Sequence, residues 1–355
     1  MKNKQKILIA MSGGVDSAVC AHLVKESGNI PEGITMMLWG CTSEDGEPNY
    51  ENDQNCIDAK RTADSLDIPH RCVALTERFK ETVVDKFISD YINGLTPNPC
   101  VECNKSIKFG ALMEYAISQG FDLLATGHYA RIEQDENGEF LLKKAVDEQK
   151  DQSYFLWSVK KEYLSRILLP LGDMTKSQVR DIAQQENLPC AKRADSQDVC
   201  FIPDGDYASF IKEHSAIEFP KGDFINVKGE KLGEHQGIIN YTVGQRKRLG
   251  ISLGHPVFVK SKCVKNNTVT LCENEELFSD LLTAHSVNIL KDGILSSPTR
   301  VEAKIRYRHS PAPALAWIED EILHLKFDEP QRAITAGQSV VLYQKDILVC
   351  GGIIN

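Results

Sequence analysis

The stretch Met11-Ser12-Gly13-Gly14-Val15-Asp16-Ser17 decides the fold of the amino-terminal part of this chain. It follows a short apolar segment, residues 7–10, and precedes a helical pattern that ends at Gly28. A strand, a Gly-Gly turn and a helix start form an anion site, because glycines admit phosphate oxygens to backbone N–H groups. The positive end of the helix dipole adds to this attraction. Ser12 and Ser17 offer hydroxyl donors, and Asp16 is suited to hold a hydrated magnesium ion.

Strand and helix patterns alternate up to about residue 203. Further strands are expected over 33–38, 71–75 and 121–125, and helices over 53–66, 77–91 and 106–119. This alternation predicts an α/β fold with a doubly wound parallel sheet. Ligands of such sheets bind beyond the carboxyl ends of the strands. The prediction therefore places the first loop, Met36 and Gly127-His128 along one rim.

Beyond about Pro203 the segments become short, alternating and bounded by turns. Strands are expected over 223–227, 256–260, 268–271, 300–307, 322–327 and 339–343. They predict two small β-rich, barrel-like parts. A chain of 355 residues accommodates three domains, which we predict over 1–203, 204–282 and 283–355.

Composition indicates which binding partners and which cellular location to expect. The net charge of −9 argues against a broadly basic nucleic-acid-binding surface, so any polyanion site must come from local clusters. Such clusters occur at 143–144, 192–193, 246–248 and 304–308, although each is more often a solvated face. No apolar run approaches the ~20 residues of a membrane span, and the polar first residues predict no signal peptide. We expect a cytoplasmic protein without a membrane partner.

Two of the eleven cysteines stand out by their context. Cys103 precedes the helix expected over 106–119 and lies beside a lysine, which predicts a lowered thiol pKa. Cys200 follows Lys192-Arg193 where the α/β pattern ends. For each cysteine alone, a small buried apolar residue is an equally good interpretation.

The glycine-rich loop lacks the Gly-Lys-Ser/Thr ending of a Walker A motif. Its Ser-Gly-Gly-Val-Asp-Ser sequence resembles the pyrophosphate loop of the ATP pyrophosphatase superfamily. Members of that superfamily cut ATP between the α- and β-phosphates and adenylate a substrate oxygen. A purely structural Gly-Gly turn is the alternative.

Six motifs in order make the resemblance more specific. They lie at 12–17, 98–109, 125–129, 150–156, 196–201 and 241–247, and Ala336-Gly337-Gln338 extends the match. Together they resemble the bacterial tRNA-specific 2-thiouridylase family. That family makes 2-thiouridine at the wobble position of tRNAs for Lys, Glu and Gln.

The resemblance implies a role for each matching residue. Cys103 would be the nucleophile and Cys200 the persulfide carrier. Asn98, Pro99 and Cys100 would face the flipped target uridine. ATP would contact Ala10, Met11, Ser12, Gly13, Gly14, Val15, Asp16, Ser17, Met36 and Gly127. Contacts with tRNA would come from His128, Lys150, Asp151, Gln152, Arg306, Tyr307 and Gln338.

The implied chemistry needs ATP, Mg²⁺, tRNA and an upstream persulfide donor. Adenylation turns the C2 oxygen of uridine into a good leaving group, and sulfur from Cys200 then replaces it. The terminal sulfur of the Cys200 persulfide would attack C2 directly, or Cys103 would attack the persulfide and free sulfide beside C2. Either route can leave a Cys103–Cys200 disulfide, which an external reductant must open.

Cys100 departs from the family pattern, where aspartate often follows Asn-Pro. With Cys103 and Cys200 it could supply three ligands to an iron–sulfur cluster, although we do not favour this reading. Two further alternatives remain open at this point. One is another ATP pyrophosphatase, such as an amidotransferase or synthetase, and the other is a non-enzymatic tRNA-binding protein.

Overall fold

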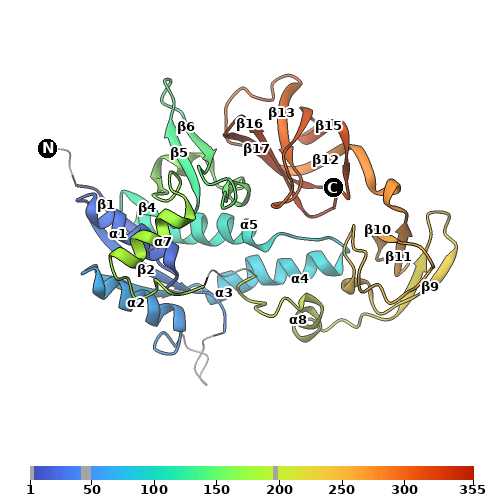
Figure 1. Cartoon of the computed structure of the whole chain (residues 1–355), viewed down its shortest axis with the longest axis horizontal. Coiled ribbons are helices and arrows are strands. Elements are labelled where there is room, and N and C mark those ends of the chain that lie inside the picture. Colours follow the sequence, from blue (N-terminus) through green and yellow to red (C-terminus); the bar gives the residue numbers. More distant parts are fainter. Residues whose placement is uncertain (1–3, 41–48, 195–198) are drawn as a thin grey trace. The chain divides into compact units, whose positions relative to one another are not determined.

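The computed structural model describes residues 4–40, 49–194 and 199–355. These residues form two compact units, each assembled from separate stretches of chain (Figure 1). Unit 1 comprises Met1–Val83, Cys100–Phe201 and Asp346–Val349. Unit 2 comprises Val84–Pro99, Ile202–Lys345 and Cys350–Asn355. The three-domain division at 203 and 282 stays a prediction.

A parallel five-stranded sheet organises unit 1, which confirms the predicted fold class. Its strand order is β3-β2-β1-β4-β7. The strands are β1 (Lys6–Ala10), β2 (Ile30–Met37), β3 (His70–Ala74), β4 (Leu123–Ala125) and β7 (Ile167–Leu168). The central strand β1 is apolar on both faces, because parallel sheets in such folds are covered on both sides.

Three helices cover one face of this sheet. They are α1 (Val15–Glu26), α2 (Gln54–Ser65) and α7 (Lys176–Gln185). Ile7 and Ile9 of β1 pack in one cluster with Val19 of α1, Ala59 of α2 and Val179 of α7. Successive strand residues alternate between faces, so Leu8 points to the opposite side, where it is equally buried.

The helix expected over 106–119 begins earlier than predicted, at Pro99. It consists of α5 (Pro99–Cys103), the π-helix η2 (Asn104–Ala111) and α6 (Leu112–Ser118). Proline suits the first helical position because its fixed φ matches a helix and that position needs no N–H donor. The helix expected over 77–91 is built from α3 (Thr76–Phe79), the π-helix η1 (Lys80–Val84) and α4 (Asp85–Ile92).

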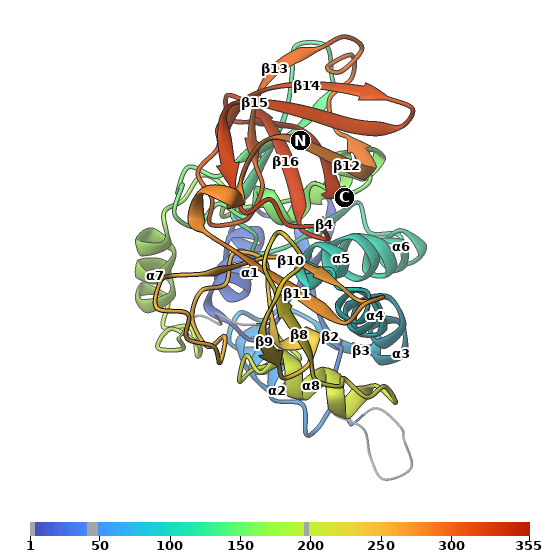
Figure 2. The same cartoon turned by 90° about the vertical axis from the view of Figure 1, so that its right-hand side faces the viewer.

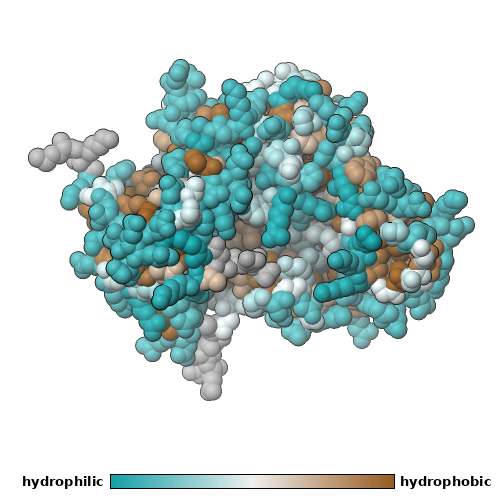
Figure 3. Space-filling view, viewed as in Figure 1, coloured by the Kyte–Doolittle hydropathy of each residue, from teal (hydrophilic) through white to brown (hydrophobic). Residues whose placement is uncertain are grey.

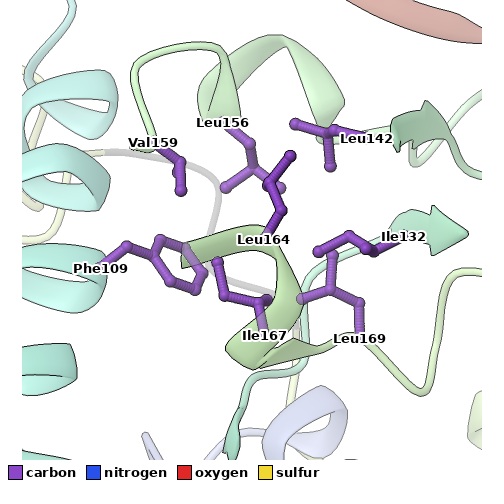
Figure 4. Close-up of a pocket in the computed structure, with 8 residues that line it drawn as sticks. All are labelled: Phe109, Ile132, Leu142, Leu156, Val159, Leu164, Ile167 and Leu169. Atoms are coloured by element: carbon purple, nitrogen blue, oxygen red, sulfur yellow. The ribbon is translucent and has the colours of Figure 1, made fainter. Parts of the chain in front are cut away.

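A hairpin that the sequence analysis did not predict completes unit 1. It joins β5 (Ala130–Gln134) to β6 (Phe140–Lys144), and the 3-10 helices η3 (Ser153–Leu156) and η4 (Lys161–Arg166) follow. Eight apolar side chains converge beside it (Figure 4). They are Phe109, Ile132, Leu142, Leu156, Val159, Leu164, Ile167 and Leu169. This lining has no polar group to orient a ligand, so we assign the cluster to the core.

Unit 2 contains a closed six-stranded barrel, visible in Figure 2. Its order is β12-β15-β14-β13-β16-β17, and β17 pairs back with β12. The strands are β12 (Phe278–Ile289), β13 (Thr299–Lys304), β14 (Ala312–Glu319), β15 (Ile322–Arg332), β16 (Ser339–Gln344) and β17 (Ile347–Ile354). Closure removes the sheet edges, which would otherwise be open to aggregation.

A smaller sheet and one helix complete unit 2. The sheet order is β10-β11-β8-β9, with β8 (Gly222–Ile225), β9 (Lys231–His235), β10 (Phe258–Cys263) and β11 (Thr268–Cys272). The helix is α8 (Tyr207–His214), and η5 (Ile238–Asn240) and η6 (Asn274–Leu277) are short 3-10 turns. The sequence pattern predicts β-rich structure throughout unit 2, but β9, β12, β14 and β17 lie outside the predicted strands.

The surface of unit 1 around α7 is largely hydrophilic (Figure 3). Among the described residues, no helix is both long enough and apolar enough to cross a lipid bilayer.

Candidate active site

The glycine-rich loop joins β1 to α1 and has the geometry that the sequence predicts. Gly13 has a φ of +74°, and a Cβ there would lie 2.8 Å from the Cβ of Asp58. Any other residue would therefore strain the backbone and collide with α2. Gly14 caps α1, and the nearest atom to a Cβ built on it would be Ser12 Oγ at 3.5 Å. The loop thus offers the first backbone N–H groups of α1 to a ligand.

Two serines brace this loop in different ways. Ser17 is buried, and its hydroxyl donates to the Gly14 carbonyl oxygen (3.0 Å) and accepts from the Ser12 backbone N–H (3.1 Å). Ser12 is exposed, so its hydroxyl can reach a ligand. Of the two predicted hydroxyl donors, Ser17 therefore acts on the loop itself.

Asp16 lies in the first turn of α1 and is held by two side chains that the sequence analysis missed. The Tyr129 hydroxyl donates to Asp16 Oδ1 at 2.8 Å, and Lys176 Nζ donates to the same oxygen at 2.6 Å. Tyr129 follows the Gly-His pair after β4, and Lys176 begins α7. The capping sequence Thr175-x-x-Gln178 marks the start of this helix, but it does not reveal the contact between Lys176 and Asp16.

Gly127 lies against the same helix start. A Cβ on Gly127 would be 2.8 Å from the carbonyl carbon of Asp16 and 3.0 Å from the Ser17 nitrogen. Met36 is the penultimate residue of β2 and is half-buried. The structure thus places Gly127 beside the loop, and the residues predicted to bind ATP occupy the ends of three neighbouring parallel strands.

Cys103 does not have the environment that the sequence predicts. It is the last residue of α5, well inside the continuous helix, and its side chain is buried. Desolvation raises the pKa of the Cys103 thiol to about 12, with smaller contributions from nearby charges. The predicted lowering of this pKa is wrong for this state, because burial outweighs the nearby positive charge.

Cys100 and Cys200 are the two other thiols that act electrostatically on Cys103. Both are exposed at the residue level, yet the protein atoms around their sulfurs raise the pKa of each thiol by desolvation. Cys200 and Cys100 each raise the Cys103 pKa by charge repulsion, and Cys100 acts on Cys200 in the same way. The three thiols therefore lie within electrostatic reach of one another, although Cys200 is almost a hundred residues from Cys103.

One cation, Lys108, acts on all three thiols and lowers the pKa of each. Lys108 lies in the π-helix η2, five residues after Cys103, and π-helical spacing aligns residues five apart. Gly110 permits this turn, because a Cβ there would lie 2.7 Å from the Lys105 carbonyl oxygen. The lysine that the sequence places beside Cys103 is Lys105, which is exposed, whereas Lys108 is the lysine that lowers the pKa of the Cys103 thiol.

His128 connects Lys108 to the rim of the sheet. Its Nε2 lies 3.3 Å from Lys108 Nζ, and its Nδ1 lies 2.7 Å from Thr126 Oγ1. An ammonium can only donate, so Nε2 accepts and Nδ1 carries the proton. Desolvation, together with the charge of Lys108, lowers the pKa of His128 well below its usual value. His128 is therefore a neutral, oriented imidazole.

The segment 150–152 pairs with the backbone next to His128. Gln152 Oε1 accepts from the Tyr129 N–H at 3.0 Å, and the Gln152 N–H donates to the Tyr129 carbonyl at 2.7 Å. Asp151 is buried and accepts from the backbone N–H groups of Ala145 and Ser153. These hydrogen bonds hold the turn that contains residues 150–152.

Unit 2 holds the other predicted tRNA contacts. Arg306 and Tyr307 lie in a turn after β13. Arg306 Nη2 donates a hydrogen bond to the Ala333 carbonyl oxygen at 2.7 Å. Gln338 Nε2 donates to the Thr96 carbonyl oxygen at 2.8 Å. Gln338 thus supports the backbone that leads to Asn98 and Pro99.

Unit 1 contains other cysteines, and the sequence left an iron–sulfur cluster open as an alternative. Cys56 and Cys190 are buried and Cys72 is half-buried, whereas Cys41 and Ser196–Asp198 lie outside the described residues. In the part of the chain that the structure describes, no group of three or more His, Cys, Asp or Glu side chains is arranged to hold a metal ion. The iron–sulfur alternative therefore gains no support.

Three family models match consecutive parts of the chain. A tRNA methyl transferase HUP domain matches residues 5–204, and a tRNA methyl transferase PRC-barrel domain matches residues 208–273. An aminomethyltransferase beta-barrel domain matches residues 279–354.

Curated relatives match over almost the whole chain. The tRNA-specific 2-thiouridylase MnmA of Clostridioides difficile (strain 630) is 46% identical over 99% of this chain and 98% of its own length. The protein of the same name from Acetivibrio thermocellus is 44% identical over 99% of this chain and its full length. That of Lachnoclostridium phytofermentans is 43% identical over 99% of each chain. These matches do not favour the amidotransferase or non-enzymatic alternatives.

Proposed function

This chain belongs to the tRNA-specific 2-thiouridylase family, and we propose that it uses ATP to convert the wobble uridine of tRNAs for Lys, Glu and Gln into 2-thiouridine. One structural observation carries the proposal for the site. The glycine-rich loop lies against Gly127, the next residue His128 lies 3.3 Å from Lys108, and the charge of Lys108 acts on both Cys103 and Cys200. Adenylation and sulfur transfer can therefore share one site in unit 1.

The loop residues Ala10–Ser17, with Met36 and Gly127, would bind ATP. The cradle fits a phosphate chain, because Gly13 leaves no room for a side chain and the helix start presents unpaired N–H groups. Asp16 would hold Mg²⁺, which supplies charge neutralisation for the departing pyrophosphate. The first step joins the C2 oxygen of uridine to the α-phosphate and releases pyrophosphate.

The thiols would then carry out sulfur transfer. Cys200 receives sulfane sulfur from an upstream persulfide donor, and the terminal sulfur attacks C2 as AMP leaves. The Cys103 thiolate attacks Cys200 Sγ, which breaks the S–S bond, forms a Cys103–Cys200 disulfide and frees the thiocarbonyl. A dithiol reductant restores both thiols. Alternatively, Cys103 attacks the persulfide first and frees sulfide beside C2.

The raised pKa of Cys103 bears on the order of these events. A thiol with a pKa of about 12 stays protonated at neutral pH and does not attack prematurely. Lys108 provides the opposing positive charge, and the desolvation that raises this pKa would have to be relieved on substrate binding for the thiolate to form.

We further propose how the substrate and donor meet the protein. Asn98, Pro99 and Cys100 would face the everted uridine, which must leave its stack before the chemistry. His128, Lys150, Asp151 and Gln152 would contact tRNA from unit 1, and Arg306, Tyr307 and Gln338 from unit 2. Persulfide chemistry and free thiols suit the reducing cytoplasm.

Nucleoside analysis by mass spectrometry tests this function. Wild-type protein with unmodified tRNA, ATP, Mg²⁺ and sulfide should yield 2-thiouridine. With a persulfide donor in place of sulfide, Cys200→Ser should yield none while still releasing pyrophosphate with tRNA. Cys263→Ser, on β10, is the matched control and should behave as wild type. Full thiolation by Cys200→Ser from the persulfide donor would refute the persulfide role.

A further inference from the structure

Lys176 is a half-buried cation inside the glycine-rich loop site to which no function has yet been assigned. Its side chain is 12% exposed, and its ammonium forms an ion pair with Asp16 at 2.6 Å. The backbone fixes the residue in place: its N–H donates to Asp147 Oδ2 at 2.9 Å, and the Thr175 capping box starts α7 at this position. The backbone of Lys176 is therefore fixed in place, whereas its long side chain can carry the ammonium group from one partner to another.

The path of this side chain crosses Tyr129. The Lys176 ammonium lies 5.7 Å from the centroid of the Tyr129 ring, and the ring itself is buried. A cation at this distance from an aromatic face is attracted to it. The Tyr129 hydroxyl donates to the same Asp16 oxygen, so Tyr129 aligns both members of the ion pair.

Asp16 Oδ1 thus receives two donors at the very position where a divalent cation would need an oxygen ligand. An ammonium and a metal ion compete for one carboxylate oxygen, because each is attracted by the same negative charge. The ammonium has three protons, however, and can serve a phosphate oxygen equally well.

We propose that Lys176 is a phosphate-binding residue of the ATP site, held on Asp16 until nucleotide arrives. The ammonium moves from Asp16 to the phosphate chain when ATP binds, and Asp16 becomes available to a divalent cation. ATP and metal binding are therefore positively coupled through one lysine. This inference rests on the proposed function, since it takes ATP as the ligand of the loop.

Equilibrium binding separates this role from a structural one. Lys176→Met should bind ATP in EDTA more weakly by on the order of thirtyfold, because a charge-assisted hydrogen bond is lost. The same variant should bind Mn²⁺, a paramagnetic substitute for Mg²⁺, several-fold more tightly without nucleotide. Lys176→Arg should recover most of the ATP affinity. A purely structural lysine would not produce opposite changes for the two ligands.

Lys60→Met is the matched control, because Lys60 forms an exposed ion pair with Asp64 on α2. It should leave both affinities unchanged. Lys176→Gln, which keeps a hydrogen-bond donor without the charge, serves as the second variant if Lys176→Met does not fold. Unchanged ATP affinity, or unchanged Mn²⁺ affinity, in the folded uncharged variant overturns the inference. The proposed function fails separately, if wild-type protein makes no 2-thiouridine.

Discussion

The glycine-rich loop and the thiols Cys100, Cys103 and Cys200 all belong to unit 1. They differ in how far apart in sequence the residues are that determine their properties. The backbone turn of the loop is shaped by contacts within a few residues, such as the hydrogen bond from the Ser17 hydroxyl to the Gly14 carbonyl, whereas Asp16 is also held by the distant residues Tyr129 and Lys176. The reactivity of Cys103 is set by burial and by Lys108 and Cys200, which lie in other turns or far along the chain. Local sequence therefore specifies the backbone turn of the glycine-rich loop, whereas the protonation state of Cys103 depends on the tertiary fold.

The largest expected effect is the pH dependence of Cys103 labelling, which tests whether burial determines the reactivity of this thiol. Because the pKa of Cys103 is about 12, its thiolate fraction should rise about tenfold per pH unit below that value, or about a thousandfold from pH 7 to pH 10. Iodoacetamide labelling of Cys103 in a Cys100→Ser/Cys200→Ser background, followed by peptide mass analysis, measures this directly. A plateau near pH 8 would contradict the buried, protonated thiol.

Gly13→Val should damage the loop without touching the thiols. The positive φ and the 2.8 Å approach to Asp58 leave no room for a side chain, so ATP affinity should fall about a hundredfold or more. Cys103 labelling should stay within twofold of wild type. Calorimetry with ATP checks the first result, and Gly28→Ala is the control, because a Cβ on Gly28 meets nothing within 4 Å. Because Gly28 has a φ of +76°, Gly28→Ala should cost a small amount of stability without affecting ATP affinity.

The neutral His128 should make stability depend on pH. Its pKa is lowered in the folded state, so below about pH 6.5 the unfolded chain binds more protons and folding is disfavoured. The wild-type protein should therefore be less stable at pH 5 than at pH 7. Urea unfolding of wild type and His128→Gln at both pH values isolates the contribution of His128. An equal pH dependence in the two proteins would rule out a neutral His128.

Lys108→Met should produce the smallest of these effects, about a tenfold slower labelling of Cys103 at pH 8. Removing the positive charge leaves only the factors that raise the thiol pKa. Lys105→Met is the matched control, because Lys105 is exposed on the same helix. If both variants label equally fast, Lys108 is not the cation that acts on the thiol.

The parallel sheet and the loop were predictable because their signals are local. Apolar strands, turn glycines and helical spacing all occur within short windows, as at Ile7–Ser17. The start of α5 was missed although Pro99 carried the signal, and this error also misplaced Cys103 relative to the helix N-terminus. Lys108 and Lys176 could not be found in the same way. Their partners, Cys200 and Asp16, are brought to them only by the tertiary fold.

Single-turnover kinetics with the Cys103→Ser/Cys200→Ser double variant tests most directly whether the loop and the thiols act as separable parts. Pyrophosphate release from ATP in the presence of tRNA should match the wild-type burst, while 2-thiouridine stays undetectable. A lost burst in the folded double variant would contradict the account, because adenylation would then require the thiols themselves.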